Sequence, residues 1–253
     1  MKGVTRDSIS IRSAGIVHIT QPVTGHRFTL DSILLADFCR VKPKERVLEP
    51  GAGTGIISLL LAKKHPRASF TAIEIQSDLA ILCEQNIMDN DLAGRMQVVR
   101  KDLRRIGTTI APGSVSIIVA NPPYILEGTG RTSPDRSRII ARQAAMVSLG
   151  SWLNLHRYLK NGGRYSLIFP AARMAELIAE LKKRKLEPKR LRLVHPFADR
   201  PASLVIVEAV KGGRTGVEVL APLIVHERGG VYSKEMREIY GMGEDKSDVI
   251  NKK

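Results

Sequence analysis

The feature that most constrains the fold is a glycine-rich turn between a β-forming run and a helix-forming run. The run Arg46–Pro50 favours a strand and carries an acid, Glu49, near its end. Residues 54–64 are apolar and favour a helix. Between them, glycines recur at every second position: Gly51, Gly53 and Gly55. Glycines at such a turn let the backbone approach a ligand closely, and the following helix N-terminus supplies amide donors.

The rest of the sequence continues this alternation of strands and helices. We expect further strands at 69–75, 96–99, 115–120, 163–169, 191–195 and 202–210. We expect further helices at 77–90, 137–159, 171–185 and 233–240. This order predicts an α/β fold with a mostly parallel central sheet and helices on both faces, which binds ligands at the carboxyl ends of its strands. No linker or repeat interrupts the chain, so residues 1–253 are predicted to form a single domain.

Three acids stand at the ends of successive predicted strands: Glu49, Glu74 and Asp102. The nicotinamide-binding pattern GxGxxG has its last glycine one residue later than here, and an acid beside the turn suits a cationic ligand. S-adenosylmethionine carries an ammonium and a sulfonium but no phosphate. We therefore expect Glu49 to face its cationic part, Glu74 to accept the ribose hydroxyls, and Asp102 to accept the adenine amine. Each acid alone is better explained as a surface carboxylate or a helix cap, but three acids at successive strand ends, with the glycine turn between the first two, favour the cofactor site.

A second motif follows the predicted strand at 115–120 and reads Asn121, Pro122, Pro123, Tyr124. A proline-rich turn at a strand exit is common, but two prolines also fix the directions of the Asn121 side chain and the Pro122 carbonyl. The motif resembles the NPPY signature of amino-methyltransferases, which include N6-adenine and N5-glutamine enzymes. The resemblance implies a Rossmann-like class I methyltransferase fold with S-adenosylmethionine as cofactor.

The chemistry of an aromatic amine accounts for the residue types of this motif. An exocyclic amine on a purine is a poor nucleophile because its lone pair is delocalised into the ring. If Asn121 and the Pro122 carbonyl accept its two N–H bonds, the nitrogen becomes pyramidal and its lone pair is exposed to the methyl group. Tyr124 would stack on the ring of a base that has left its stack. The proton can leave after methylation, so no strong general base is required.

The charge of the chain favours a nucleic acid as the substrate. The formal net charge is +15 and the isoelectric point about 10.1, and such a surplus attracts polyanions. A stretch beside the motif carries four arginines suited to RNA phosphates: Arg131, Arg136, Arg138 and Arg142. A second basic cluster lies at 182–192, either as more of the RNA-binding surface or as a solvated helix end.

The whole pattern is similar to bacterial tRNA adenine-N6 methyltransferases that modify the adenosine at position 37 of a valine tRNA. The resemblance covers most of the chain, including 27–35 upstream and 195–202 downstream of the catalytic motif. It implies that residues 1–40 form an extension over the cofactor, with Phe28 and Asp31 near it, although Asp31 is equally placed to cap a helix. His195 and Asp199 are interpreted as a structural corner, and Trp152 and Met146 as core residues.

Other functions remain open at this stage. The same chemistry serves N5 methylation of a protein glutamine or N2 methylation of an rRNA guanine, and a non-catalytic RNA-binding module could keep the pocket.

No metal-binding motif is present. The N-terminus lacks the apolar core of a signal peptide and no run has the roughly 20 apolar residues of a membrane span, so we expect a cytoplasmic protein. The polar tail at 243–253 is expected to be disordered, and the sequence does not predict the oligomeric state.

Overall fold

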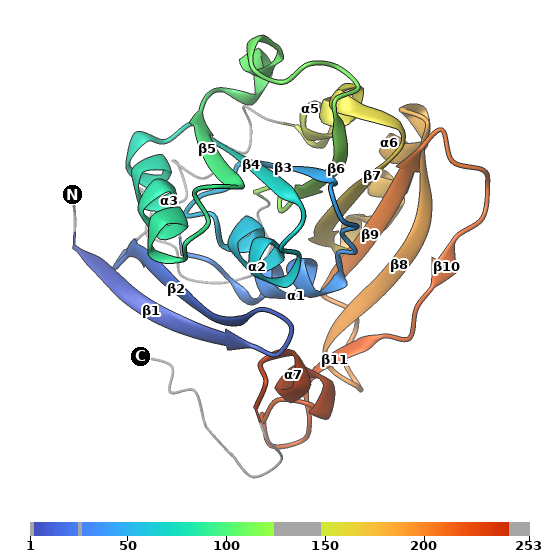
Figure 1. Ribbon diagram of the computed structural model, residues 1–253. Coiled ribbons are helices and arrows are strands. Elements are labelled where there is room, and N and C mark those ends of the chain that lie inside the picture. Colours follow the sequence, from blue (N-terminus) through green and yellow to red (C-terminus); the bar gives the residue numbers. More distant parts are fainter. Residues whose placement is uncertain (1–2, 25–26, 124–147, 243–253) are drawn as a thin grey trace.

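A nine-stranded sheet forms the centre of the computed structural model, which describes residues 3–24, 27–123 and 148–242 (Figure 1). Its order is β10-β8-β9-β7-β6-β3-β4-β5, with β11 beside β8. The strands from β5 to β7 are parallel, and β9 runs antiparallel between β7 and β8. The bounds are β3 (Arg46–Pro50), β4 (Ser69–Glu74), β5 (Met96–Arg100), β6 (Val115–Ala120), β7 (Leu159–Pro170), β8 (Leu186–Phe197), β9 (Leu204–Lys211), β10 (Glu218–Val219) and β11 (Leu223–His226).

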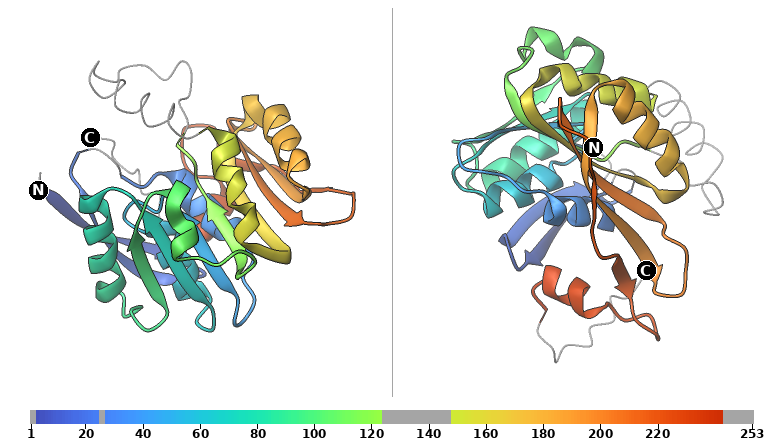
Figure 2. Two further views of the ribbon diagram at one scale, coloured as in Figure 1. Left: turned by 90° about the horizontal axis from the view of Figure 1, so that it is seen from above. Right: turned by 90° about the vertical axis from the view of Figure 1, so that its right-hand side faces the viewer.

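Helices cover both faces of this sheet (Figures 1 and 2). One hydrophobic cluster lies under α1 (Leu30–Phe38), α2 (Ile56–Lys64) and α3 (Ser77–Asp89), and a second lies under α5 (Leu149–Leu153) and α6 (Met174–Lys183). Short 3₁₀ helices link the elements: η1 (Leu103–Thr108), η2 (Asn154–Tyr158) and η3 (Ala171–Arg173). The predicted arrangement, a mostly parallel sheet between two helical layers, is confirmed. None of the described helices is long and apolar enough to cross a bilayer.

The N-terminal segment, which the resemblance describes only as an extension over the cofactor, contains a β-hairpin. Strands β1 (Val4–Ile11) and β2 (Gly15–Pro22) pair antiparallel and pack on α2 and α3. The fully buried Asn86 of α3 accepts from the Thr20 amide at 2.7 Å and donates to the Thr20 carbonyl at 3.0 Å. An asparagine thus supplies the pairing that a neighbouring strand would give, and this satisfies the backbone of β2. The hairpin is thereby joined to the main fold.

Three expected boundaries are corrected. Helix α1 begins at Leu30 after Thr29, so Asp31 lies in its first turn and is not its N-cap. Helix α2 begins at Ile56, because the preceding Gly55 has a positive φ of 88° that no α-helix accepts. The helix expected over 137–159 is wrong at its end: α5 and η2 are short, and Leu159 already begins β7. There, pairing of Leu159 with Val115 outweighs helix propensity, while 137–147 lies outside the described residues.

The C-terminal part after β9 completes the sheet edge. Strands β10 and β11 pair parallel with β8, and the short helix α7 (Lys234–Ile239) follows. Tyr232 and Tyr240, at the two ends of α7, stack with ring centroids 5.4 Å apart. This part packs against the same hydrophobic cluster as the N-terminal hairpin, and the Arg12 amide donates to the Ile239 carbonyl at 3.1 Å. The tail at 243–253 lies outside the described residues.

Candidate active site

A cavity of about 710 Å³ lies at the carboxyl ends of β3, β4 and β6, where a sheet of this topology is expected to bind a ligand. Its walls come from segments that are far apart in the sequence, including the start of α1, the glycine turn and the loop after β6. Predicted site residues that line it are Phe28, Asp31, Glu49, Gly51, Gly53, Glu74, Asp102, Asn121, Pro122 and Pro123. Gly55 is not among the lining residues.

The glycine turn needs its glycines for backbone conformation and for close packing. Gly51 and Gly53 have φ values of 63° and 57°, in the left-handed region that other residues rarely adopt. A Cβ on Gly51 would also stand 2.5 Å from Cη2 of Trp152. A Cβ on Gly55 would stand 2.6 Å from Sγ of Cys83 on α3. Gly55 therefore serves the packing of α2 against α3, whereas Gly51 and Gly53 shape the cavity itself.

Glu49 and Glu74, here called the acidic floor, are both buried and both held by backbone amides. Oε2 of Glu49 accepts from the Ser58 amide at 2.8 Å. Oε2 of Glu74 accepts from the Gly53 amide and Oε1 from the Gln76 amide, each at 2.8 Å. Burial raises the pKa of Glu49 to about 7, and the charge of Glu74 adds to the rise. A cationic ligand above this floor would lower the pKa of Glu49 again, because it stabilises the charged form of both carboxylates.

Asp102 lines the cavity but is already engaged by a neighbouring arginine. It caps η1 by accepting from the Arg104 amide at 2.9 Å, and both its oxygens accept from Arg104 Nε at 3.0 Å. The Arg104 side chain lowers the pKa of Asp102, so this carboxylate stays ionised. Asp102 was predicted to accept from an adenine amine, and the arginine two positions later is the signal in the sequence for its present partner.

The cavity fits the predicted cofactor in its charges and in its apolar wall. The acidic floor suits an ammonium. Oε2 of Glu74 accepts from one amide and keeps a lone pair for a ribose hydroxyl, whereas Oε1 also accepts from Nε2 of Gln76 at 3.5 Å. Beside Glu74, the Ile75 side chain lines the cavity and is 56% exposed, and Leu103 and Leu155 line it as well. A purine ring would cover this apolar surface. No described residues form a group of ligands for a metal ion.

Asn121, Pro122 and Pro123 follow β6 directly and line one edge of the cavity. We call it the catalytic edge, after the role expected of Asn121. Nδ2 of Asn121 donates to Oγ of Ser32 on α1 at 3.4 Å. Pro122 is buried and Pro123 is exposed, and both line the cavity. The remaining residues of this prediction lie outside the described part of the chain: Tyr124, Arg131, Arg136, Arg138 and Arg142.

Four cations line the same cavity, and none of them was predicted as a site residue. They form what we call the basic rim: Arg27, Lys101, Arg104 and Arg157. Arg27, Arg104 and Arg157 are exposed. Arg27 lies 3.3 Å from Asp7 and Arg104 pairs with Asp102, whereas Lys101 and Arg157 have no acidic partner among the described residues. Three separate segments supply these residues, and only the fold brings them together. No pattern in the sequence signals such a grouping.

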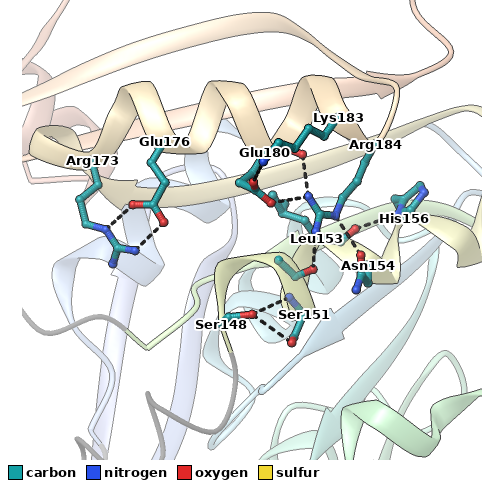
Figure 3. A network of polar contacts seen from close by, with 11 residues as sticks. Ser148, Ser151, Leu153, Asn154, His156, Arg173, Glu176, Glu180, Lys183 and Arg184 are labelled. Carbon is teal, nitrogen blue, oxygen red and sulfur yellow. Dashed lines mark hydrogen bonds and ion pairs between the residues drawn. The ribbon is translucent and has the colours of Figure 1, made fainter.

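The second basic cluster, at 182–192, is largely engaged within the protein. Arg184 donates to Glu180 at 2.6 Å and to Asn154 at 2.9 Å, which joins the end of α6 to α5 and η2 (Figure 3). Lys182 pairs with Glu187. Further along β8, Arg190 lies 3.6 Å from Glu208, and Arg192 lies 2.7 Å from Glu235. These contacts support the helix-end interpretation of this cluster over an RNA-binding one.

Two further sequence interpretations can be compared with the structure. His195 Nδ1 contacts the Arg200 carbonyl at 2.8 Å, which fits a structural corner at the end of β8. Trp152 is a core residue, 4% exposed, as expected, yet its ring also lines the cavity and packs against Gly51. Met146 lies outside the described residues.

Comparison with known proteins places these features in a family. The model of the methyltransferase small domain matches residues 26–153, which contain the glycine turn, the acids and the catalytic motif. The chain belongs to this family. It is therefore an S-adenosylmethionine-dependent methyltransferase, and the predicted family resemblance and class I fold are confirmed.

Individual relatives extend over more of the chain. A protein of Parabacteroides distasonis named tRNA1(Val) (adenine(37)-N6)-methyltransferase is 30% identical, over 70% of this chain and 74% of its own. A protein of the same name from Vibrio campbellii is 24% identical, over 85% of this chain and 87% of its own. Among solved structures, a predicted O-methyltransferase from Agrobacterium tumefaciens shares the fold, with a TM-score of 0.66, 23% identity, and 84% and 96% of the two chains covered.

Proposed function

We propose that this methyltransferase acts on N6 of an adenosine in tRNA, at position 37 of a valine tRNA. The observation that carries the proposal is Asn121, which lies at the edge of a cavity with an acidic floor and a basic rim. The Parabacteroides and Vibrio relatives carry the name of this activity, and they match this chain over most of their length.

The acidic floor orients the cofactor in this account. Bound S-adenosylmethionine supplies an electrophilic methyl group on a sulfonium. Glu49 neutralises positive charge beneath it, and Glu74 holds the glycine turn in place while accepting hydrogen bonds on its free lone pairs. The buried setting of both carboxylates strengthens these interactions, because little water competes for them. The floor thus acts on binding and placement.

The catalytic edge acts on the amine. The Asn121 side-chain oxygen and the Pro122 carbonyl accept the two N–H bonds of the target amine, which favours a pyramidal nitrogen with an exposed lone pair. No general base is required, because the proton can leave to solvent once the nitrogen is cationic. Rate enhancement then comes from orientation and hydrogen bonding.

The basic rim favours RNA over a protein glutamine as the substrate. An adenosine that enters the cavity brings its own and neighbouring phosphates to the surroundings of Arg27, Lys101 and Arg157. A glutamine in a peptide carries no such charge, so Lys101 and Arg157, which have no acidic partner among the described residues, would find none in that substrate either. The rim would serve an adenine and a guanine substrate equally, so the identity of the methylated nucleoside distinguishes the two.

The test is to identify the product. The purified protein is incubated with bulk unmodified tRNA and methyl-labelled S-adenosylmethionine, and the RNA is digested to nucleosides. We expect the label in N6-methyladenosine. Label in N2-methylguanosine or in protein would replace the proposed substrate. Absence of label from RNA and protein, with cofactor binding retained, would indicate the non-catalytic alternative.

A further inference from the structure

The amide of Asn121 can serve an amine only in one of its two orientations. A carboxamide is nearly symmetric in shape, but its oxygen accepts hydrogen bonds and its nitrogen donates them. With the nitrogen turned toward the cavity, two donors would face the two N–H bonds of the substrate and repel it. The proposed reaction therefore needs a contact that sets the orientation of this side chain.

Ser32 provides that contact from a different part of the fold. It lies in the first turn of α1, it is 6% exposed, and it lines the cavity. Its Oγ accepts from Nδ2 of Asn121 at 3.4 Å, across 89 positions of sequence. A hydroxyl can accept from an amide nitrogen or donate to an amide oxygen, and Ser32 takes the first role, which turns the oxygen of Asn121 away from α1.

The loop after β6 leaves the oxygen of Asn121 available. An asparagine at a turn commonly accepts from a backbone amide one or two residues further on. Here those positions are Pro122 and Pro123, which have no N–H group. Among the described residues, no donor is paired with Oδ1 of Asn121. The prolines therefore prevent local capture of the oxygen, while Ser32 engages the nitrogen.

We propose that Ser32 is a positioning residue for methyl transfer, which acts by fixing the orientation of the Asn121 carboxamide. The inference rests on the proposed function of Asn121 as acceptor for the target amine. It also gives the N-terminal segment a role beyond covering the cavity, because α1 sets the geometry of the catalytic loop.

The test is a double-mutant cycle on single-turnover methyl transfer, with Ser32→Ala, Asn121→Ala, the double variant and the wild type. Loss of one hydrogen bond predicts about tenfold slower transfer by Ser32→Ala. Cofactor affinity by calorimetry and the KM for tRNA should stay within about twofold, because Ser32 does not act on either ligand. In the Asn121→Ala background, Ser32→Ala should have no further effect, since its target is gone.

Ser32→Thr keeps the hydroxyl and should recover most of the lost rate, whereas Ser32→Cys keeps the size but is a weak acceptor and should not. An unchanged rate in Ser32→Ala would overturn the inference. So would a full additional loss in the Asn121→Ala background, or a loss of cofactor affinity that accounts for the slower rate. These outcomes are separate from failure of the proposed function, which would appear in the wild-type product as a methyl group on something other than adenosine.

Discussion

The acidic floor and the catalytic edge of the cavity differ in how completely their polar groups are engaged. Glu49 and Glu74 together accept from three backbone amides at 2.8 Å, so the floor is rigid without any ligand. Among the described residues, the Asn121 side chain makes one hydrogen bond, to Oγ of Ser32 at 3.4 Å. The floor is therefore preorganised for a small cation, whereas the edge keeps an acceptor for a group that arrives later. Changes at the floor should alter cofactor affinity, and changes at the edge should alter turnover.

The largest effect is expected at the edge. Asn121→Ala should lower turnover by about 10³-fold, because it removes an acceptor that is needed mainly in the transition state. Cofactor affinity, measured by calorimetry, should change less than twofold. A similar loss of cofactor affinity would show that the catalytic edge and the acidic floor do not act independently. Full activity of Asn121→Ala would show that Asn121 has no role in methyl transfer.

At the floor, Glu74→Ala should weaken cofactor binding by about 10²-fold, because one carboxylate holds both the glycine turn and the ligand. The rate of methyl transfer at saturating cofactor should fall much less. Glu84→Ala removes an exposed acid from α3 and serves as the matched control, with no expected change in affinity. If Glu74→Ala bound the cofactor normally but transferred the methyl group slowly, the floor would act on turnover, contrary to the role given to it here.

The raised pKa of Glu49 predicts how cofactor affinity depends on pH. Below pH 7 the free protein takes up a proton on Glu49 and loses the charge that attracts the ligand. Affinity should therefore fall about tenfold from pH 8 to pH 6, and Glu49→Gln should flatten this part of the profile. The same shift means that the folded chain binds more protons than the unfolded chain between the usual glutamate pKa and 7. The contribution of Glu49 to stability then decreases as pH rises through that window, and thermal unfolding should show this trend.

The smallest effect is expected at the basic rim, which acts on the substrate before chemistry. Arg157→Ala should raise the KM for tRNA about fivefold. It should also reduce the slope of the logarithm of tRNA affinity against the logarithm of salt concentration by about one. Lys160→Ala, an exposed cation outside the cavity lining, is the matched control and should change neither value. Equal effects from both variants would mean that general charge attracts RNA and that the rim has no specific role.

The parts that could be predicted from the sequence are those in which the signal is local. The glycine turn and the alternation of strands and helices identify the sheet and the position of Glu49 and Glu74, because each unit is encoded in a contiguous stretch. The hairpin of β1 and β2 was not predicted, because the backbone of β2 is satisfied by Asn86 and Asn90, far along the chain. A polar asparagine in a helix pattern does not signal that role.

The parts that could not be predicted depend on contacts between distant segments. The basic rim and the contact of Ser32 with Asn121 exist only once α1, β6 and η2 are brought together. The basic run at 182–192 gave the opposite error, since its acidic partners are spread along the chain from Glu180 to Glu235. Counting charges along a sequence therefore overestimates a surface whose cations are mostly paired, and misses cations such as Lys101 and Arg157 that the fold brings to one cavity.

Methylation of a valine tRNA transcript by the wild-type protein tests the central claim most directly. Two transcripts are compared under single-turnover conditions, one with adenosine at position 37 and one with guanosine there, and the labelled nucleoside is mapped. The account predicts N6-methyladenosine at position 37 in the first transcript and no label in the second. Equal labelling of both transcripts, or label at another base, would contradict it.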